Sequence, residues 1–324
     1  MITRVTATLG RTVGDLEIYR RELTGYCYRM LGSSFDAEDA VQDALMKAMR
    51  AAGDFAGRAS VRSWLYRIAT NVCLDMLRAR RRRAIPYQLG PARPPVEDSL
   101  ADVLPDGSWV SPIADERVLP PEADPAEIAE QRDTVRLAFV AALQHLPPRQ
   151  RAVLILCEVL RWQAAEVAEL LDTSVAAVTS ALQRARATLA VADVGDPRVE
   201  EPDAALLDRY VDAFQRYDID ALVGLLHEDA LQTMPPFAMW LRGAEHIGTW
   251  MLTVGCECRD SILLPAAANG APAFGQYRVD PAGGHTAWAL QVLTIERGRI
   301  SQIHSFLEAQ RLFPSFGLPA HLSA

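Results

Sequence analysis

Hydrophobic residues recur at helical spacing through the first two thirds of this chain and at strand spacing near its end. Apolar positions three and four residues apart predict amphipathic helices over 15–31, 36–51, 61–83, 126–190 and 202–226. Short alternating stretches between Gly, Pro and Asn predict strands over 230–234, 261–265, 273–279, 285–295 and 299–306. Helices followed by a run of strands indicate a multi-domain chain: two all-α domains and a C-terminal α+β domain.

Residues 147–190 have the pattern of a helix-turn-helix. Asp172 tolerates a left-handed backbone, and Ser174 supplies a hydroxyl N-cap for the second helix. In such a motif the second helix enters the DNA major groove by its N-terminal half. An ordinary helical hairpin with solvated arginines would show the same local pattern. The residues on or near the outward face are Ser174, Val175, Ala177, Ser180, Gln183, Arg184 and Arg186.

Residues 84–125 contain nine prolines and few core-like positions, which is typical of a linker rather than a domain. Residues 191–201 form a second predicted hinge. The predicted organisation is therefore a first helical domain over 1–83, a linker over 84–125, a second helical domain over 126–190, a hinge over 191–201 and a tail over 202–324.

The net charge of −8 is unevenly distributed along the chain. Residues 1–83 carry 15 Lys and Arg against 9 Asp and Glu, whereas residues 191–324 carry 9 against 17. This polarity favours a nucleic-acid partner for the helical domains and argues against a uniform enzyme. We further expect the acidic tail to dock on or near the basic domains.

The chain contains no run of about 18 uncharged apolar residues and no signal-peptide core at its N-terminus. We therefore expect a soluble cytoplasmic protein without a membrane partner. The five cysteines are scattered apart from Cys256-Glu257-Cys258, which fits neither a disulfide framework nor a structural zinc site. No metal or cofactor is expected.

Two blocks of sequence resemble a known family. FDAEDAVQDALMKAMR, followed by FAGRASVRSWLYRIATNVCLDMLRARRRR, resembles region 2 of the extracytoplasmic-function sigma factors of bacterial RNA polymerase, and residues 147–190 resemble region 4. The resemblance implies a factor that binds the β′ and β subunits of core RNA polymerase and directs transcription initiation at specific promoters. It implies that the polar face formed by Asp39, Gln42 and Asp43 binds the clamp helices of β′.

The same resemblance implies two contacts with promoter DNA. The loop over 55–60 and the helix after it would capture unstacked bases of the −10 element. The outward face of the helix-turn-helix would read the −35 element as a duplex, although its alanine-rich first turn favours methyl contacts, shape or weak specificity. The linker would follow the RNA path of the polymerase, with a solubilising tether as the alternative. The −10 candidates are Phe55, Arg58, Ser60, Arg62, Asn71, Arg78 and Arg80.

The tail resembles the SnoaL-like members of the NTF2-like cone fold in AALLDRYVDAFQRYDIDALVGLLHEDALQTMPP, WLRGAEHIGTWM and ALQVLTIERGRISQIHSFLE. LLPAAANGAPAFGQYR and RLFPSFGLP resemble the tail of the sigma-G-like group, which implies an attached regulator. We see no paired carboxylates for acid–base chemistry and expect a non-catalytic domain with room for a small ligand. Retained catalysis is the alternative. The candidate pocket residues are Tyr210, Met234, Trp240, Tyr277, Trp288 and His304.

A second function remains open from the residues alone. A helix-turn-helix regulator that never contacts polymerase, fused to a ligand-binding or catalytic SnoaL-like domain, would have much of the same pattern. The face of Asp39, Gln42 and Asp43 argues against that alternative, because a DNA-binding repressor has no use for an acidic partner surface there.

Overall fold

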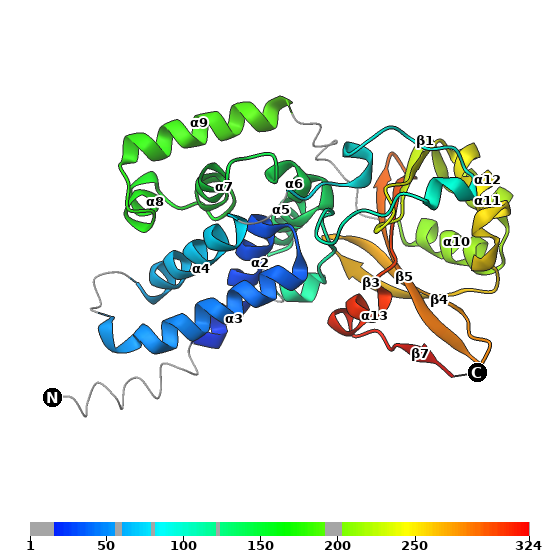
Figure 1. Cartoon of the computed structure of the whole chain (residues 1–324), viewed down its shortest axis with the longest axis horizontal. Coiled ribbons are helices and arrows are strands. Elements are labelled where there is room, and N and C mark those ends of the chain that lie inside the picture. Colours follow the sequence, from blue (N-terminus) through cyan, green and yellow to red (C-terminus); the bar gives the residue numbers. More distant parts are fainter. Residues whose placement is uncertain (1–15, 56–59, 79–81, 121–123, 192–202, 324) are drawn as a thin grey trace. The chain divides into compact units, whose positions relative to one another are not determined.

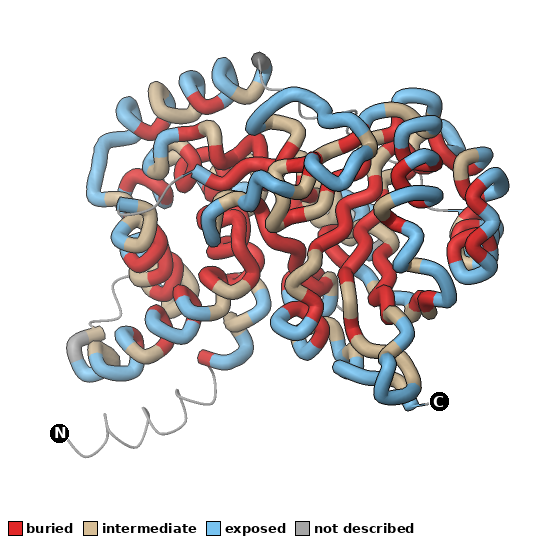
Figure 2. The backbone as a smooth tube through the Cα atoms, turned by 45° about the vertical axis from the view of Figure 1, so that its right-hand side comes forward, coloured by how far each residue is buried: buried red, intermediate tan, exposed pale blue. Residues whose placement is uncertain are grey.

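The computed structural model describes residues 16–55, 60–78, 82–120, 124–191 and 203–323. The chain divides into two compact units, one formed by residues 1–83 and 116–195 and the other by residues 84–115 and 196–324. The first unit is helical, and the second contains a seven-stranded sheet with helices (Figure 1). Buried positions line the interior of both (Figure 2). Residues 84–115, most of the stretch that the sequence predicts as a linker, thus belong to the tail unit.

The first helical segment consists of α2 (Arg20–Leu31), α3 (Ser34–Ala51) and α4 (Val61–Leu77), with a short turn η1 (Glu17–Tyr19) before them. Ser33 caps α3 by accepting a hydrogen bond from the Asp36 amide, and Ser60 caps α4 by accepting one from the Ser63 amide. Side-chain oxygens thus satisfy amides that the first helical turn leaves unpaired. The N-cap at Ser60 confirms the start of α4 predicted from the sequence.

The second helical segment contains α5 (Pro125–Val135), α6 (Leu137–Leu143), α7 (Pro148–Leu154), the π-turn η6 (Ile155–Val159), α8 (Ala164–Leu170) and α9 (Val175–Val191). The turn between α8 and α9 has the predicted chemistry. Asp172 has a left-handed backbone with φ of 51°, and Ser174 Oγ accepts a hydrogen bond from the Ala177 amide at 3.2 Å. Val178 and Ala185 lie on the buried face of α9.

The two helical segments pack together inside the first unit. Arg29 on α2 donates to the backbone oxygen of Thr134 at 3.1 Å, and Arg151 on α7 donates to the Met30 carbonyl and to Gln144. Gly32, which ends α2 with φ of 67°, lies against the same Gln144 side chain, since a Cβ there would approach it to 3.1 Å. Arginine donors and close backbone packing therefore join the segments.

The tail unit is built on one sheet in the order β2-β1-β6-β5-β4-β3, with β7 paired to β5. Only β1 and β6 run parallel among the described strand pairs, and the β5–β6 hairpin turns at Arg297 and Gly298, which both have positive φ. The strand bounds are β1 Leu226–Thr233, β2 Trp240–Arg242, β3 Ile262–Ala268, β4 Ala271–Val279, β5 His285–Glu296, β6 Arg299–Phe306 and β7 His321–Leu322.

Helices cover both faces of this sheet. One face packs against α10 (Ala204–Gln215), α11 (Ile219–Leu225) and α12 (Ala244–Leu252), through a core that includes Phe274, Leu293 and Ile303. The opposite face holds Tyr277, whose ring meets Phe313 of η8 (Phe313–Phe316) at 5.2 Å after α13 (Ala309–Leu312). Alternation along β4, β5 and β6 therefore sends successive side chains to different surroundings.

Residues 84–115 are held to the tail by main-chain hydrogen bonds. The Leu104 amide donates to the Pro236 carbonyl at 2.8 Å, and the Ala238 amide donates to the Asp102 carbonyl at 2.9 Å. Further along, the Ile113 amide donates to Asn269 Oδ1 at 3.0 Å. The segment includes the short turns η3 (Pro86–Gln88) and η4 (Glu97–Leu100). Proline removes donors but leaves carbonyls, so a proline-rich strand can still dock by its remaining amides.

Candidate functional site

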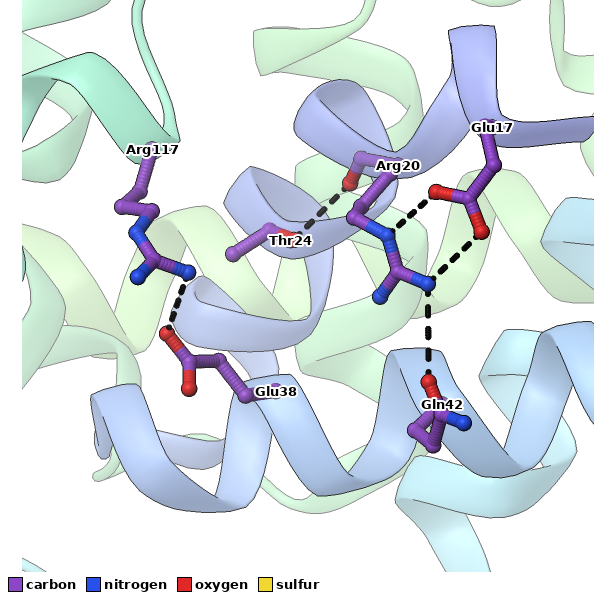
Figure 3. A network of polar contacts seen from close by, with 6 residues as sticks. All are labelled: Glu17, Arg20, Thr24, Glu38, Gln42 and Arg117. Atoms are coloured by element: carbon purple, nitrogen blue, oxygen red, sulfur yellow. Dashed lines mark hydrogen bonds and ion pairs between the residues drawn. The ribbon is translucent and has the colours of Figure 1, made fainter. Parts of the chain in front are cut away.

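The candidate polymerase-binding face lies on the outer side of α3. Asp39, Gln42 and Asp43 are exposed there, while Ala40 and Ala44 on the same helix are buried. Arg20 reaches Gln42 at 3.4 Å while bound mainly to Glu17, and Arg117 reaches Glu38 (Figure 3). Within the described part of the chain, neither Asp39 nor Asp43 forms an ion pair. Two uncompensated carboxylates are therefore presented to solvent on one helix face.

The candidate −10 residues surround the start and the exposed side of α4. Phe55 packs against Trp64 with ring centroids 4.9 Å apart, Ser60 caps the helix, and Asn71 is exposed. Arg78 is exposed and paired with Asp75 at 2.9 Å. Arg58 and Arg80 lie outside the described residues, so the proposed cluster is only partly described.

Arg62 and the neighbouring Arg67 are engaged inside the helical unit. Arg62 binds Glu22 at 2.9 Å and lies over the ring of Trp162 at 5.4 Å. Arg67 donates to the carbonyls of Glu169 and Leu170 at 2.6 and 3.2 Å, where α8 ends. A cation at the C-terminal carbonyls of a helix is favourable, so the second helical segment occupies this side of α4.

The candidate −35 residues lie on α9 and its N-cap, and they are exposed except for Ser180, which is half-buried. Val175 in the first turn is 48% exposed, although it is apolar. Arg184 donates to Ser180 Oγ at 2.6 Å, and Arg186 is paired with Glu158. The first turn therefore presents small apolar groups, and the arginines lie about two to three turns further along.

The tail unit encloses a cavity of about 370 Å³ between the sheet and its helices. Tyr210, Met234 and Trp288 are among its lining residues, as the sequence predicts. A β-bulge at Trp288, between the pairs Gln276–Ala289 and Tyr277–Ala287, places this ring beside Arg278, whose guanidinium lies 4.1 Å from the ring centroid.

The other three candidate pocket residues lie elsewhere. Tyr277 donates to the Pro319 carbonyl on the opposite face of the sheet, and Trp240 donates through Nε1 to the Gly90 carbonyl. His304 is enclosed between Thr233 and Gln302, with Nδ1 2.8 Å from Thr233 Oγ1. Burial lowers the pKa of His304 to about 4, so the ring is neutral near pH 7. Successive side chains of a strand point to opposite faces, which explains why His304 lies outside the cavity while its neighbours Ile303 and Ser305 line it.

A chain of neutral side chains forms the polar wall of the cavity. Tyr210 donates to Gln291 Oε1 at 2.7 Å, Gln291 donates to Gln276 Oε1 at 2.9 Å, and Gln276 donates to Ser261. Burial raises the pKa of Tyr210 and of Cys258, which keeps both groups protonated near pH 7. Gln232 and Gln291 were not among the pocket residues predicted from the sequence. Glutamine at an apolar strand position was the signal that could have identified them.

Neither a membrane helix nor a metal site emerges from the described residues. No described helix is both long enough and apolar enough to span a bilayer. Likewise, no cluster of three His, Cys, Asp or Glu in this part of the chain has the geometry of a metal site.

Comparison with known proteins identifies all three parts of the chain. The family model for sigma-70 region 2 matches residues 16–83, that for sigma-70 region 4 matches residues 136–189, and that for a SnoaL-like domain matches residues 207–303. The first two matches fall on α2–α4 and on α6–α9. The third falls on the sheet unit, where it covers α10 through most of β6.

Similar proteins share this organisation over most of their length. The chain is 46% identical over 315 residues to the ECF RNA polymerase sigma factor SigG of Mycobacterium tuberculosis, covering 94% of this chain and 83% of that protein. It is 27% identical to SigJ of the same organism over 89% of each. The crystal structure of SigJ matches 95% of this chain and 99% of its own, with a TM-score of 0.60 and 23% identity. The similarity to the SigJ structure is one of fold.

Proposed function

This chain belongs to the extracytoplasmic-function (ECF) RNA polymerase sigma factors, which direct transcription initiation at specific promoters, and we propose which of its surfaces carries each step. The helical unit binds core polymerase and promoter DNA. The tail unit regulates these contacts through the connecting segment, residues 84–115.

Core polymerase binds the face formed by Asp39, Gln42 and Asp43 on α3. The observation that carries this proposal is the exposure of two carboxylates without an ion pair on a domain that is otherwise basic. Unpaired surface charge on a basic domain adds nothing to folding, but it steers and orients a basic partner.

Replacing Asp43 with Arg tests this face. We expect at least about a tenfold loss of affinity for core polymerase in a co-purification or fluorescence-anisotropy assay, because the charge at a complementary interface is reversed. Asp208→Arg is the matched control, since Asp208 is an exposed acid on α10 and undergoes the same charge change. Wild-type retention of polymerase by Asp43→Arg would contradict the proposal.

Promoter DNA is contacted at two places. Phe55, Ser60, Arg62, Asn71 and Arg78, with Arg58 and Arg80 beyond the described residues, contact the −10 strand. The exposed side of α9 contacts the −35 duplex. Support comes from the exposure of Asn71 and of the α9 face, and from the aromatic pair at the start of α4. Arg62 has to leave Glu22 and Trp162 before it binds DNA, so the described packing corresponds to a state without promoter.

The tail regulates by holding the connecting segment. Main-chain hydrogen bonds with Pro236 and Ala238 fix residues 102–104 to the tail, and a segment held there cannot at the same time follow the RNA path of polymerase. Leu104→Pro removes the amide that donates to Pro236. We expect increased transcription from the cognate promoter, and a similar increase on deletion of residues 202–324.

Val103→Pro is the matched control for Leu104→Pro. Among the described residues the Val103 amide donates no hydrogen bond, so the same substitution one position earlier keeps the docking bonds. Transcription that is unchanged by both Leu104→Pro and the deletion, at equal protein abundance, would contradict regulation through this segment.

The tail acts without catalysis in this proposal. Neither His nor Asp is among the described residues that line its cavity, and the one histidine predicted for it, His304, is buried elsewhere. Glutamate can also act as a general base, but of the two carboxylates in the lining Glu97 is exposed, and Glu257 is paired with Arg278, which lowers the pKa of Glu257. These features support a regulatory rather than an enzymatic tail.

A further inference from the structure

The tail cavity contains one buried acceptor without a donor. Gln232 on β1 is 6% exposed and lines the cavity, and its Oε1 has no hydrogen-bond partner among the described residues. The neighbouring glutamines Gln276 and Gln291 are both hydrogen-bonded. A buried unpaired amide oxygen is costly in a folded protein, and this oxygen is also closed off from the open space, so a donor from outside pairs with it once the Gln232 side chain has turned.

The residues that line the cavity indicate which class of molecule carries that donor. Phe214, Phe237, Trp250 and Trp288 contribute aromatic surface, and aliphatic side chains add further apolar surface. Arg278, the one cation among the described lining residues, is paired with Glu257 at 2.5 Å, and the remaining carboxylate, Glu97, is exposed to solvent. An apolar cavity with a neutralised cation and an unpaired acceptor is suited to an uncharged, flat molecule with a hydroxyl or N–H group.

The connecting segment closes one side of the same cavity. Glu97 and Leu100 of η4 belong to its lining, and Leu100 packs against the hydrophobic core of the tail. The chain then continues to Asp102 and Leu104, whose main-chain groups pair with Ala238 and Pro236. A molecule in the cavity would thus bury the Leu100 side chain further and strengthen docking of the segment.

We propose that this cavity binds an uncharged, flat, mainly apolar molecule whose hydrogen-bond donor pairs with Gln232 after this side chain turns its Oε1 into the cavity, and that η4 closes over the bound molecule. Binding holds residues 84–115 on the tail. Only the consequence for transcription rests on the proposed function, because occupancy and closure are properties of the tail unit alone.

Two probes that differ in one donor test the site. 2-Naphthol is flat and carries a hydroxyl, whereas 2-methoxynaphthalene has the same rings without a donor. By isothermal titration calorimetry on the full chain, we expect saturable binding of 2-naphthol. Gln232→Leu should weaken it about tenfold, the usual effect of one buried hydrogen bond, and leave the affinity for 2-methoxynaphthalene unchanged. Gln232→Met is the substitute if the leucine variant does not fold by circular dichroism.

A second pair of variants tests closure by η4. Leu100→Ser should weaken both probes alike, because it removes apolar contact but no donor or acceptor for the ligand. Leu89→Ser is the matched control, since Leu89 lies in the same segment, is 44% exposed and is absent from the cavity lining. Hydrogen exchange at the Leu104 amide should slow when 2-naphthol is bound.

Three results would overturn the proposal. They are absence of saturable binding of 2-naphthol to the wild type at about 1 mM, an equal loss of both probes in Gln232→Leu, and a Leu100→Ser variant that behaves like Leu89→Ser in binding and exchange. Because these measurements need neither polymerase nor DNA, their failure is distinguishable from failure of the polymerase-binding or promoter-binding proposals.

Discussion

Buried arginine side chains join the two segments of the helical unit, whereas buried glutamine side chains line the cavity of the tail unit. Arg29 and Arg151 are each 4% exposed, and burial lowers the pKa of each guanidinium to about 10. Both remain charged near neutral pH and donate mainly to backbone carbonyls. In the tail, Gln276 and Gln291 carry no charge and bond to one another.

This difference distinguishes an interface between two helical segments from the wall of a cavity. A guanidinium that leaves carbonyl acceptors regains strong hydration, so the two helical segments can separate at moderate cost. Neutral amides gain less from water and keep the tail cavity uncharged. This difference fits the proposed roles, in which the helical segments separate to bind DNA and the tail cavity holds an uncharged molecule.

The largest expected effect comes from removing a buried arginine between the two helical segments. Arg151→Met leaves the Met30, Gln144 and Leu146 carbonyls without their donor, so the free energy of unfolding should fall by about 3–5 kcal/mol in urea titrations. Arg149→Met on the same helix is the control, because Arg149 is exposed. If both variants are equally stable, the hydrogen bonds of Arg151 contribute far less to the free energy of unfolding than their number indicates.

A smaller effect is expected from acid on the tail. The folded-state pKa of His304 is about 4, below the usual 6.5, because the ring is buried. Between these two pKa values, His304 is protonated in the unfolded chain but neutral in the folded tail. This difference should remove about 3 kcal/mol of stability as the pH falls from about 6.5 to about 4.

Urea titrations across that pH range check the acid effect. His304→Gln should lack this portion of the pH dependence, while His246→Gln, at an exposed position on α12, should retain it. Identical pH profiles for His304→Gln and the wild type would show that the folded tail accommodates the charged ring.

The smallest effect concerns the link between α4 and α8. Arg67→Ala removes two hydrogen bonds to the Glu169 and Leu170 carbonyls, which are partly exposed, so the loss should be about 1 kcal/mol. Amide exchange at the end of α8 should quicken correspondingly. Unchanged exchange there would mean that water replaces the guanidinium without cost.

Local features of the fold were predictable from the sequence because each depends on a few neighbouring residues. Ser60 as an N-cap, Asp172 and Ser174 in the helix-turn-helix, and the hairpin at Arg297-Gly298 all follow from side-chain or backbone preferences at one turn. The family resemblance supplied the order of the three parts. Its matches to region 2, region 4 and a SnoaL-like domain are confirmed.

Features that depend on which distant segments meet were not predictable. The docking of residues 84–115 uses main-chain groups, which leave no pattern of side chains in the sequence. His304 and Trp240 were predicted as pocket residues. The face to which each points depends on its position in the alternation of its own strand, β6 or β2, which residue type alone does not give.

The connecting segment precedes its own docking surface by a long stretch of chain, which has a consequence during synthesis. At about 5–20 residues per second, a ribosome needs roughly 6–25 s to add residues 203–323 after α9 is complete. Over that time both helical segments exist while residues 84–115 have no sheet to join. On the proposed regulation, each new copy of the factor passes through a short unrestrained period, and the rate of translation sets its length.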